Sequence, residues 1–160
     1  MVFAVVFASL SLAVQAQQPF EPVTFSVSGF SCVSCARTVQ KKLSEVAELR
    51  DVVVTLPDHR ARMRIDPNVT SLQSITGVIA GPSGKFIPRL LLKLDERATF
   101  PQVKQTLEAV AGVRYVREPN DQGLMLIDLR AGEKTTLNQI YQAAKRAGLK
   151  VADAPFSKPN

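Results

Sequence analysis

The sequence contains no tryptophan, one histidine and only two cysteines among its 160 residues. With His59 as the only imidazole, no Ser-His-Asp or Cys-His pair can be argued, and we expect a protein that is not an enzyme. A zinc site of four Cys or His ligands is disfavoured, because only Cys32 and Cys35 supply thiols. Aromatic residues make up 6% of the chain, which argues against a nucleic-acid partner despite a net charge of +6. We interpret this charge as a solvated basic surface.

The chain also has no apolar stretch long enough to span a bilayer. The apolar residues 3–14, FAVVFASLSLAV, are too few. The small residues of VQA at 14–16 and the polar segment QQPFEP that follows are typical of a cleaved secretory signal, although no Lys or Arg precedes the run. We therefore predict a signal peptide over 1–16, a spacer over 17–22 and a secreted, periplasmic protein with no membrane span in the mature chain. A buried strand or helix is the alternative interpretation of 3–14.

An internal repeat dominates the remaining sequence. Apolar residues at helical spacing recur 64 residues apart, as Val39 and Val103 do. The matching sets are Val39, Leu43, Val46, Leu49 and Val52, then Val103, Leu107, Val110, Val113 and Val116. This similarity indicates a duplicated unit of about 65 residues. We predict one unit over 23–88, a second unit without cysteine over 89–155, and a tail over 156–160.

Each unit has the same predicted order of elements. In the first unit, alternating apolar residues indicate strands near 23–27, 52–56 and 61–65, and helical spacing follows Cys35 and again Thr70. A last strand must lie within GKFIPRL, residues 84–90. The order β-α-β-β-α-β is that of the ferredoxin-like sandwich, in which two helices cover one face of a four-stranded antiparallel sheet. The predicted fold class is α+β, with two such sandwiches in tandem.

Three helix starts carry the Thr-x-x-Gln pattern of a capping box. The predicted boxes are Thr70 with Gln73, Thr99 with Gln102, and Thr136 with Gln139.

Three arginines alternate with apolar residues over 60–65. We expect Arg60, Arg62 and Arg64 to face water on an edge strand, where charge also discourages pairing between sheets. An acidic partner is the alternative explanation for these charges.

The two units are joined by a very short connection. The segment GKFIPRLLLKLDE must supply the last strand of the first unit and the first strand of the second. We therefore expect a fixed mutual orientation, with one long strand shared and bent at Pro88. With the 64-residue offset, Cys32 corresponds to Glu96 and Cys35 to Thr99, so we expect no soft metal in the second unit.

Cys32 and Cys35 fall between the first strand and the first helix. Backbone N–H groups at a helix start stabilise a thiolate, so the pair fits a disulfide, a redox dithiol or a pair of metal ligands. A disulfide between them closes a loop of two intervening residues and stabilises little. Two thiolates form a soft site of low coordination number, which suits Cu(I) or Hg(II) better than Zn(II), Mg²⁺ or Ca²⁺.

The stretch GFSCVSCARTVQKKL, residues 29–43, resembles the heavy-metal-associated domains of periplasmic mercury-binding proteins, copper chaperones and metal-transporting ATPases. The family pattern Gly-Met-x-Cys-x-x-Cys is matched at Gly29, Cys32 and Cys35, with Phe30 in place of Met. Pro82 stands where members often carry an aromatic residue or Lys after a Gly. The resemblance covers residues 23–88. It implies binding of Cu(I) or Hg(II) by the two cysteines and transfer of the ion to a partner such as a metal-transporting membrane protein. The alternative functions are a dithiol oxidoreductase that uses the cysteine pair and an interaction module in which the Cys-free second unit docks a metal transporter.

Three further residues are candidates for the surroundings of the metal. Phe30 is expected to pack beside the site, and Lys85 could offset the charge of a bis-thiolate centre or simply face water. In the ferredoxin-like fold, the hairpin that carries His59 lies at the same end as the loop after the first strand. His59 is therefore a possible third ligand, with a solvent-facing turn residue as the alternative.

Overall fold

The computed structural model describes residues 20–95 and 98–153 of the 160 residues. The predicted signal peptide, Glu96 and the tail lie outside the described residues. The elements in chain order are β1 (Glu21–Ser28), α1 (Val33–Ser44), β2 (Arg50–Thr55), β3 (Arg60–Ile65), α2 (Leu72–Ala80), β4 (Ile87–Leu94), α3 (Phe100–Glu108), β5 (Val113–Val116), β6 (Leu124–Leu129), α4 (Leu137–Arg146) and β7 (Val151–Asp153). Among the described residues, no helix has the length and hydropathy needed to cross a membrane.

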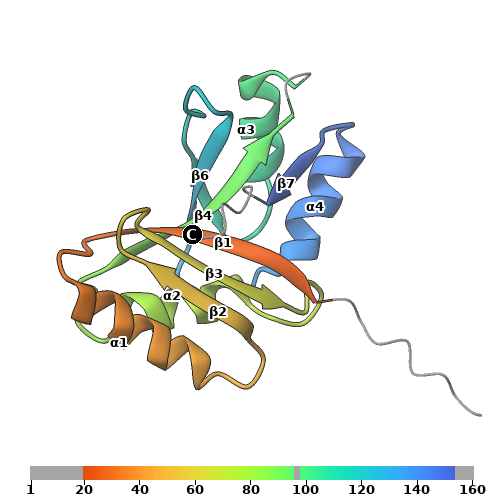
Figure 1. The fold of residues 1–160 in the computed structure, drawn as a ribbon. Coiled ribbons are helices and arrows are strands. Elements are labelled where there is room, and N and C mark those ends of the chain that lie inside the picture. The colour runs from red at the N-terminus through yellow and green to blue at the C-terminus, as the bar shows by residue number, and fades with distance from the viewer. Residues whose placement is uncertain (1–19, 96–97, 154–160) are drawn as a thin grey trace, which may run out of the picture.

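The strands form one antiparallel sheet in the order β2-β3-β1-β4-β6-β5, with β7 paired to β4 (Figure 1). The order β2-β3-β1-β4 and the order β5-β6-β4-β7 are the same topology, built once from each half of the chain. The predicted α+β fold of two ferredoxin-like units is confirmed.

The two units share β4, which is the last strand of the first unit and the first strand of the second. Its first half pairs with β1 at Phe25–Leu90, while its second half pairs with β6 at Leu92–Met125 and with β7 at Leu94–Val151. Pro88 lies in the half that pairs with β1. Figure 1 shows the two units meeting at an angle along β4. The predicted boundary between residues 88 and 89 falls inside this strand, and the division into two domains stays a prediction.

One hydrophobic core extends through both units. Directly paired residues of antiparallel strands point to the same face, so Phe25, Leu90 and Ile127 form a row across β1, β4 and β6. All three side chains are fully buried and belong to the same cluster as the apolar residues of all four helices. The four helices therefore cover the same face of the sheet.

Only one of the three predicted capping boxes forms. Thr136 and Gln139 exchange hydrogen bonds between side chain and backbone at the start of α4. Thr99 is the N-cap of α3 but makes no side-chain hydrogen bond there. The N-cap of α2 is Ser71 rather than Thr70. The predictions for α2 and α3 were therefore wrong.

The capping box of α2 does not form because the Gln73 side-chain amide makes hydrogen bonds to the second unit instead. Gln73 Nε2 donates to Thr135 Oγ1 at 2.9 Å and to the Gly112 carbonyl at 3.3 Å, and its Oε1 accepts the Thr135 N–H at 2.7 Å. The Leu72 N–H donates to the Thr135 carbonyl at 2.9 Å, next to a β-bridge between Ser71 and Thr136. Thr135 is completely buried, so satisfying its polar groups outweighs a local cap.

Two details of the first unit differ from expectation. Strand β1 begins at Glu21, inside the predicted spacer, because Glu21 pairs with Ile65. Strand β3 is not an edge strand, since it lies between β2 and β1, and Arg62 is only 8% exposed. Burial together with Arg60 lowers the pKa of Arg62, and Asp153 and Asp58 act in the opposite direction. The expectation that Arg62 faces water was wrong.

One added methyl group at the junction between the units, at Gly112, is expected to destabilise the fold strongly. Gly112 has φ +86°, and a Cβ there would collide with Thr135 Oγ1 and lie 2.7 Å from Gln73 Nε2. We expect Gly112→Ala to lower the free energy of unfolding by about 2–4 kcal/mol, from left-handed strain and this clash. Gly132→Ala is the control, because Gly132 has the same φ, while a Cβ there would meet no atom of a more distant residue within 4 Å. It should cost only about 1–2 kcal/mol. Urea denaturation that gave equal losses for both variants would contradict the role of this junction.

Candidate metal site

Three loops meet at one end of the first unit, around the side chain of Phe30. Phe30 lies in the β1–α1 loop and is 5% exposed. Its ring contacts Phe86 of the α2–β4 loop edge-on, with ring centroids 5.1 Å apart. It stacks on His59 of the β2–β3 hairpin with the centroids 6.5 Å apart and the planes 22° from parallel. The expected placement of the hairpin at this end is what the structure shows.

Cys32 is the N-cap of α1. Its backbone is extended, with φ −152° and ψ 152°, and its carbonyl accepts the N–H groups of Cys35 and Ala36. Its Sγ accepts the Cys35 N–H at 3.2 Å and lies 3.1 Å from Ser34 Oγ. The first turn of α1 contains no acidic residue. This position stabilises negative charge on sulfur, because the unpaired N–H groups of a helix start point toward it.

Cys32 and Cys35 are joined by a disulfide, with their Cα atoms 5.3 Å apart. Both residues are half-exposed, and Cys35 packs against the core. The disulfide is the oxidised form common to all three interpretations of the pair, since a redox pair passes through it and a metal-binding pair forms it when oxidised. It therefore does not distinguish among them.

Gly29 and Phe30 hold the loop in place before the first cysteine. Gly29 has φ +99°, and a Cβ at this position would approach the Lys85 carbonyl oxygen to 2.8 Å. Only glycine satisfies both requirements at once. The next side chain, Phe30, then enters the core, which fixes the direction in which the chain continues to Cys32.

Sequence reasoning missed the role of Phe86. The expected aromatic position after Gly81 is occupied by Pro82, which is exposed, but Phe86 brings an aromatic ring to Phe30 from the same loop. The sequence did contain a signal for this role, because Phe86 is the only aromatic residue between Gly81 and Pro88. Lys85 is exposed, and its Nζ lies 5.7 Å from the centre of the Phe86 ring.

His59 is exposed and has φ +50° in the tight hairpin turn. Its carbonyl accepts the Val27 N–H at 2.7 Å, which ties the hairpin to β1. Within residues 20–95 and 98–153, no group of three or more His, Cys, Asp or Glu side chains gathers as a metal site. His59 therefore touches the site through Phe30, and a role as third ligand stays a prediction.

The second unit has the helix start without the sulfur. Thr99 occupies the N-cap of α3, the position that Cys32 holds on α1. The sequence offset had instead aligned Thr99 with Cys35. The thiol pair is thus confined to the first unit.

A groove of about 660 Å³ runs between α3 and α4 of the second unit and is lined by Lys134, Arg146 and several small or amide side chains.

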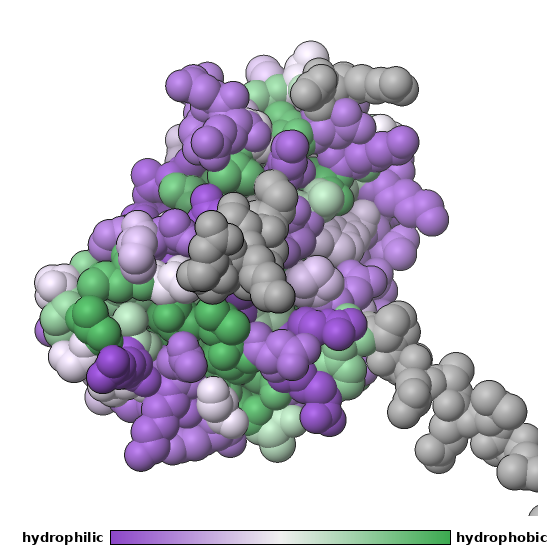
Figure 2. Space-filling view, viewed as in Figure 1, coloured by the Kyte–Doolittle hydropathy of each residue, from purple (hydrophilic) through white to green (hydrophobic). Residues whose placement is uncertain are grey.

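Apolar side chains are exposed close to the cysteines. Val33, which follows Cys32, is 55% exposed, and Ile87 at the start of β4 is 49% exposed. Figure 2 shows hydrophobic surface on the first unit, including the part near the start of α1, whereas hydrophilic side chains predominate over the second unit. The end that carries the disulfide therefore presents a partly apolar surface.

Comparisons with known proteins identify relatives of the first unit in particular. The model of the heavy-metal-associated domain matches residues 24–85. The periplasmic component of a mercuric transport protein from Pseudomonas aeruginosa is 38% identical over 77 residues, which are 46% of this chain and 85% of that protein. The copper-transporting ATPase HMA4 of Oryza sativa subsp. japonica is 29% identical over 111 residues, or 62% of this chain and 11% of the ATPase. The crystal structure of oxidized MerP from Ralstonia metallidurans CH34 is 30% identical, covers 45% of this chain and 97% of that one, and gives a TM-score of 0.40.

The fold and the site define a class of ferredoxin-like proteins with a Cys-x-x-Cys pair at the start of the first helix. The similarity to the mercuric transport component extends over most of that protein's length. The chain belongs to the heavy-metal-associated domain family.

Phe30 provides a test of how the loops are held together. We expect Phe30→Ala to destabilise the fold by about 3–5 kcal/mol, because a buried ring that contacts two other loops is lost. Phe30→Met should cost less than about 1.5 kcal/mol, because methionine fills a similar volume. His59→Asn is the control, because His59 is exposed and asparagine tolerates the positive φ of this position. It should change stability by about 0.5 kcal/mol or less. Urea denaturation measures all three. Equal losses for Phe30→Ala and His59→Asn would refute the central position of Phe30.

Proposed function

We propose that the reduced protein binds one soft metal ion, Cu(I) or Hg(II), between Cys32 and Cys35 and delivers it to a partner protein. The observation that carries this proposal is the placement of Cys32 Sγ at the N-cap of α1, where it accepts the Cys35 N–H at 3.2 Å. A thiolate is favoured there, and thiolates are the ligands that soft ions prefer. Zn(II) fits less well, since it usually takes four ligands.

The metal is cargo, and its binding requires the reduced form of the cysteine pair, in which the disulfide is absent. Two electrons and two protons from a thiol reductant convert the disulfide into two thiols. Binding of the ion then displaces the thiol protons and forms two S–metal bonds. Gly29 and Phe30 keep the two sulfurs at the rigid end of a strand and a helix, so little ordering is needed when the ion arrives.

Transfer follows from the low coordination number. A thiolate of the partner adds to the two-coordinate ion and gives a three-coordinate intermediate. One S–metal bond to Cys32 or Cys35 then breaks, and a second exchange releases the ion to the partner. No covalent bond of a substrate is made or broken, so the protein acts as a carrier rather than an enzyme. Lys85 would reduce the negative charge of the bis-thiolate complex, and His59 would border it.

The location and organisation of the carrier are part of the same proposal. A secretory signal over 1–16 would deliver it to the periplasm, where the mercuric transport relatives are named as components. Residues 23–88 would form the metal-binding domain, and residues 89–155 a second domain without a soft-metal site. A membrane protein that transports metal is the expected partner.

The cysteine pair provides the direct test. We expect one Cu(I) or Hg(II) per chain, and Cys32→Ser or Cys35→Ser should remove most of the affinity, because no other thiol exists. Anaerobic titration with Cu(I), Hg(II) and Zn(II), read by native mass spectrometry with competing chelators, measures both stoichiometry and preference. Ser34→Ala is the matched control, because Ser34 lies beside Cys32 Sγ without being a soft ligand. Unchanged tight binding by the double Cys→Ser variant would disprove the site.

A dithiol oxidoreductase is the second candidate, because the N-cap position of Cys32 that favours a metal-binding thiolate also favours an attacking thiolate. We expect the reduced protein to reduce insulin only slowly, because apart from the helix start and Ser34 no described contact tunes the attacking sulfur. Insulin turbidity with thioredoxin as the positive reference is the measurement. Turnover at the rate of thioredoxin, abolished by either Cys→Ser change, would replace the carrier function by a redox function.

A further inference from the structure

The face of the sheet opposite the helices collects basic side chains from both units. Cross-strand pairs place Ser26 beside Arg60 and Arg89, and Thr24 beside Arg62, on this face. Lys93 pairs with Leu124, and Asp128 pairs with Tyr115. We call the following set the basic face: Arg60, Arg64, Arg89, Lys93 and Arg117.

None of the four described helices covers the basic face, since each of them contributes buried apolar residues to the core on the other side. Between the arginines of β3 and those of the second unit lies a small apolar cluster of Leu91, Leu124 and Leu126. Figure 1 shows that the two units meet at an angle along β4, so this side of the sheet is contributed by both. Ser28, the last residue of β1 before the cysteine loop, lies at its border.

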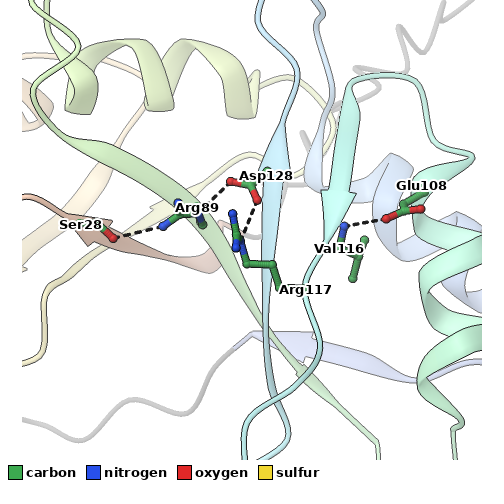
Figure 3. A network of polar contacts seen from close by, with 6 residues as sticks. All are labelled: Ser28, Arg89, Glu108, Val116, Arg117 and Asp128. Carbon is green, nitrogen blue, oxygen red and sulfur yellow. Dashed lines mark hydrogen bonds and ion pairs between the residues drawn. The ribbon is translucent and has the colours of Figure 1, made fainter.

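Charge on the basic face is only partly neutralised within the chain. Asp128 is shared by two arginines, with its Oδ1 2.8 Å from Arg89 Nε and its Oδ2 3.0 Å from Arg117 Nε (Figure 3). Arg89 Nη1 also donates to Ser28 Oγ at 3.1 Å. The side chains of Asp128 and Arg89 are 20% and 18% exposed, while that of Arg117 is 47% exposed.

The arginines of the first unit are similar. Arg64 Nη1 lies 3.8 Å from Asp51 Oδ2, its Nε and Nη2 donate to the neutral Phe20 carbonyl at 3.1 Å and 2.7 Å, and its side chain is 51% exposed. Arg60, Arg62 and Arg64 are spaced two residues apart on the same side of one strand, so their like charges repel. Asp153 and Asp58 compensate Arg62 in part. Cations still outnumber carboxylates across the face, which costs folding free energy and points to an external anion as the compensating group.

We infer that the basic face docks an acidic segment of the protein that exchanges metal with this chain. This inference rests on the proposed carrier function. Guanidinium groups bind carboxylates in planar, two-point contacts, so Asp and Glu side chains fit these arginines. Because Arg89 contacts Ser28 next to Gly29, a segment bound on the face ends beside the cysteine loop. A partner held there would have its own thiols close to Cys32 and Cys35.

An acidic protein segment fits this face better than a nucleic acid. Single-stranded nucleic acids stack their bases on several aromatic side chains. The basic face offers Tyr115, which is 44% exposed, and Lys104 Nζ and the Arg117 guanidinium already lie 4.5 Å and 5.9 Å from its ring centre. Carboxylates require no such stacking surface.

The test measures binding of a short peptide of alternating Glu and Ser to the full chain by fluorescence anisotropy. A Gln/Ser peptide and a single-stranded oligonucleotide of equal charge are the comparison ligands. The test pair Lys93→Ser with Arg117→Ser should weaken binding of the Glu/Ser peptide by about tenfold. The control pair Lys41→Ser with Lys145→Ser removes the same charge from exposed last turns of α1 and α4 and should have a much smaller effect. Asp128→Asn should tighten binding, because it removes the competing carboxylate.

Each outcome bears on the inference. Equal weakening by the two variant pairs would mean that the peptide binds through net charge, and would overturn the inference. Preference for the oligonucleotide, absence of peptide binding, or a signal caused only by self-association would overturn it as well. Circular dichroism confirms that each variant is folded. The titrations are repeated with Cys32→Ser/Cys35→Ser protein, which should bind the peptide as the wild type does. The Lys93→Ser/Arg117→Ser variant should still bind one Cu(I) per chain. Failure of the wild type to bind metal would reject the proposed carrier function, whereas failure of peptide binding would reject only the docking surface.

Discussion

Hydrogen bonding along both edges of β4 is the constraint on which the rest of this structure depends. One edge of the strand is occupied by β1 and then β7, and the other by β6. A strand paired in this way cannot shift register toward one unit without breaking its pairing with the other, and a slip of one residue would turn Leu90 and Leu92 out of the core. The two units are therefore parts of one sheet, and the Cys-free half is built into the scaffold of the half that carries the cysteine pair.

The cysteine loop benefits from this scaffold at its fixed points. Gly29 lets the chain pass the Lys85 carbonyl, Phe30 anchors between Phe86 and His59, and Cys32 starts α1. These contacts come from three loops that meet around Phe30. A site already organised in this way can accept and release an ion while the backbone stays in place, as the proposed ligand exchange requires.

The second unit repeats the strand and helix order of the first without its cysteines. Thr99 takes the helix-start position of Cys32, while Gln73, Gly112 and Thr135 form a buried polar contact between the units. On the other side of the sheet, Asp128 of the second unit contacts Arg89 of the shared strand, which in turn contacts Ser28 before the loop. The second unit thus contributes to surfaces and contacts around the first, and this is where we expect its purpose to lie.

The sequence by itself determined the repeat, the β-α-β-β-α-β order, the fold class and the position of Cys32 and Cys35 at a helix start, because periodicity and spacing act locally along the chain. Tertiary structure decided what depends on partners distant in sequence. Gln73 binds Thr135 instead of capping α2, Arg62 is buried because β3 lies inside the sheet, and Phe86 reaches Phe30 from another loop. A local pattern such as Thr-x-x-Gln offers one hydrogen-bonding choice, and a buried polar group elsewhere can offer a better one. Only the packing of the whole chain selects between them.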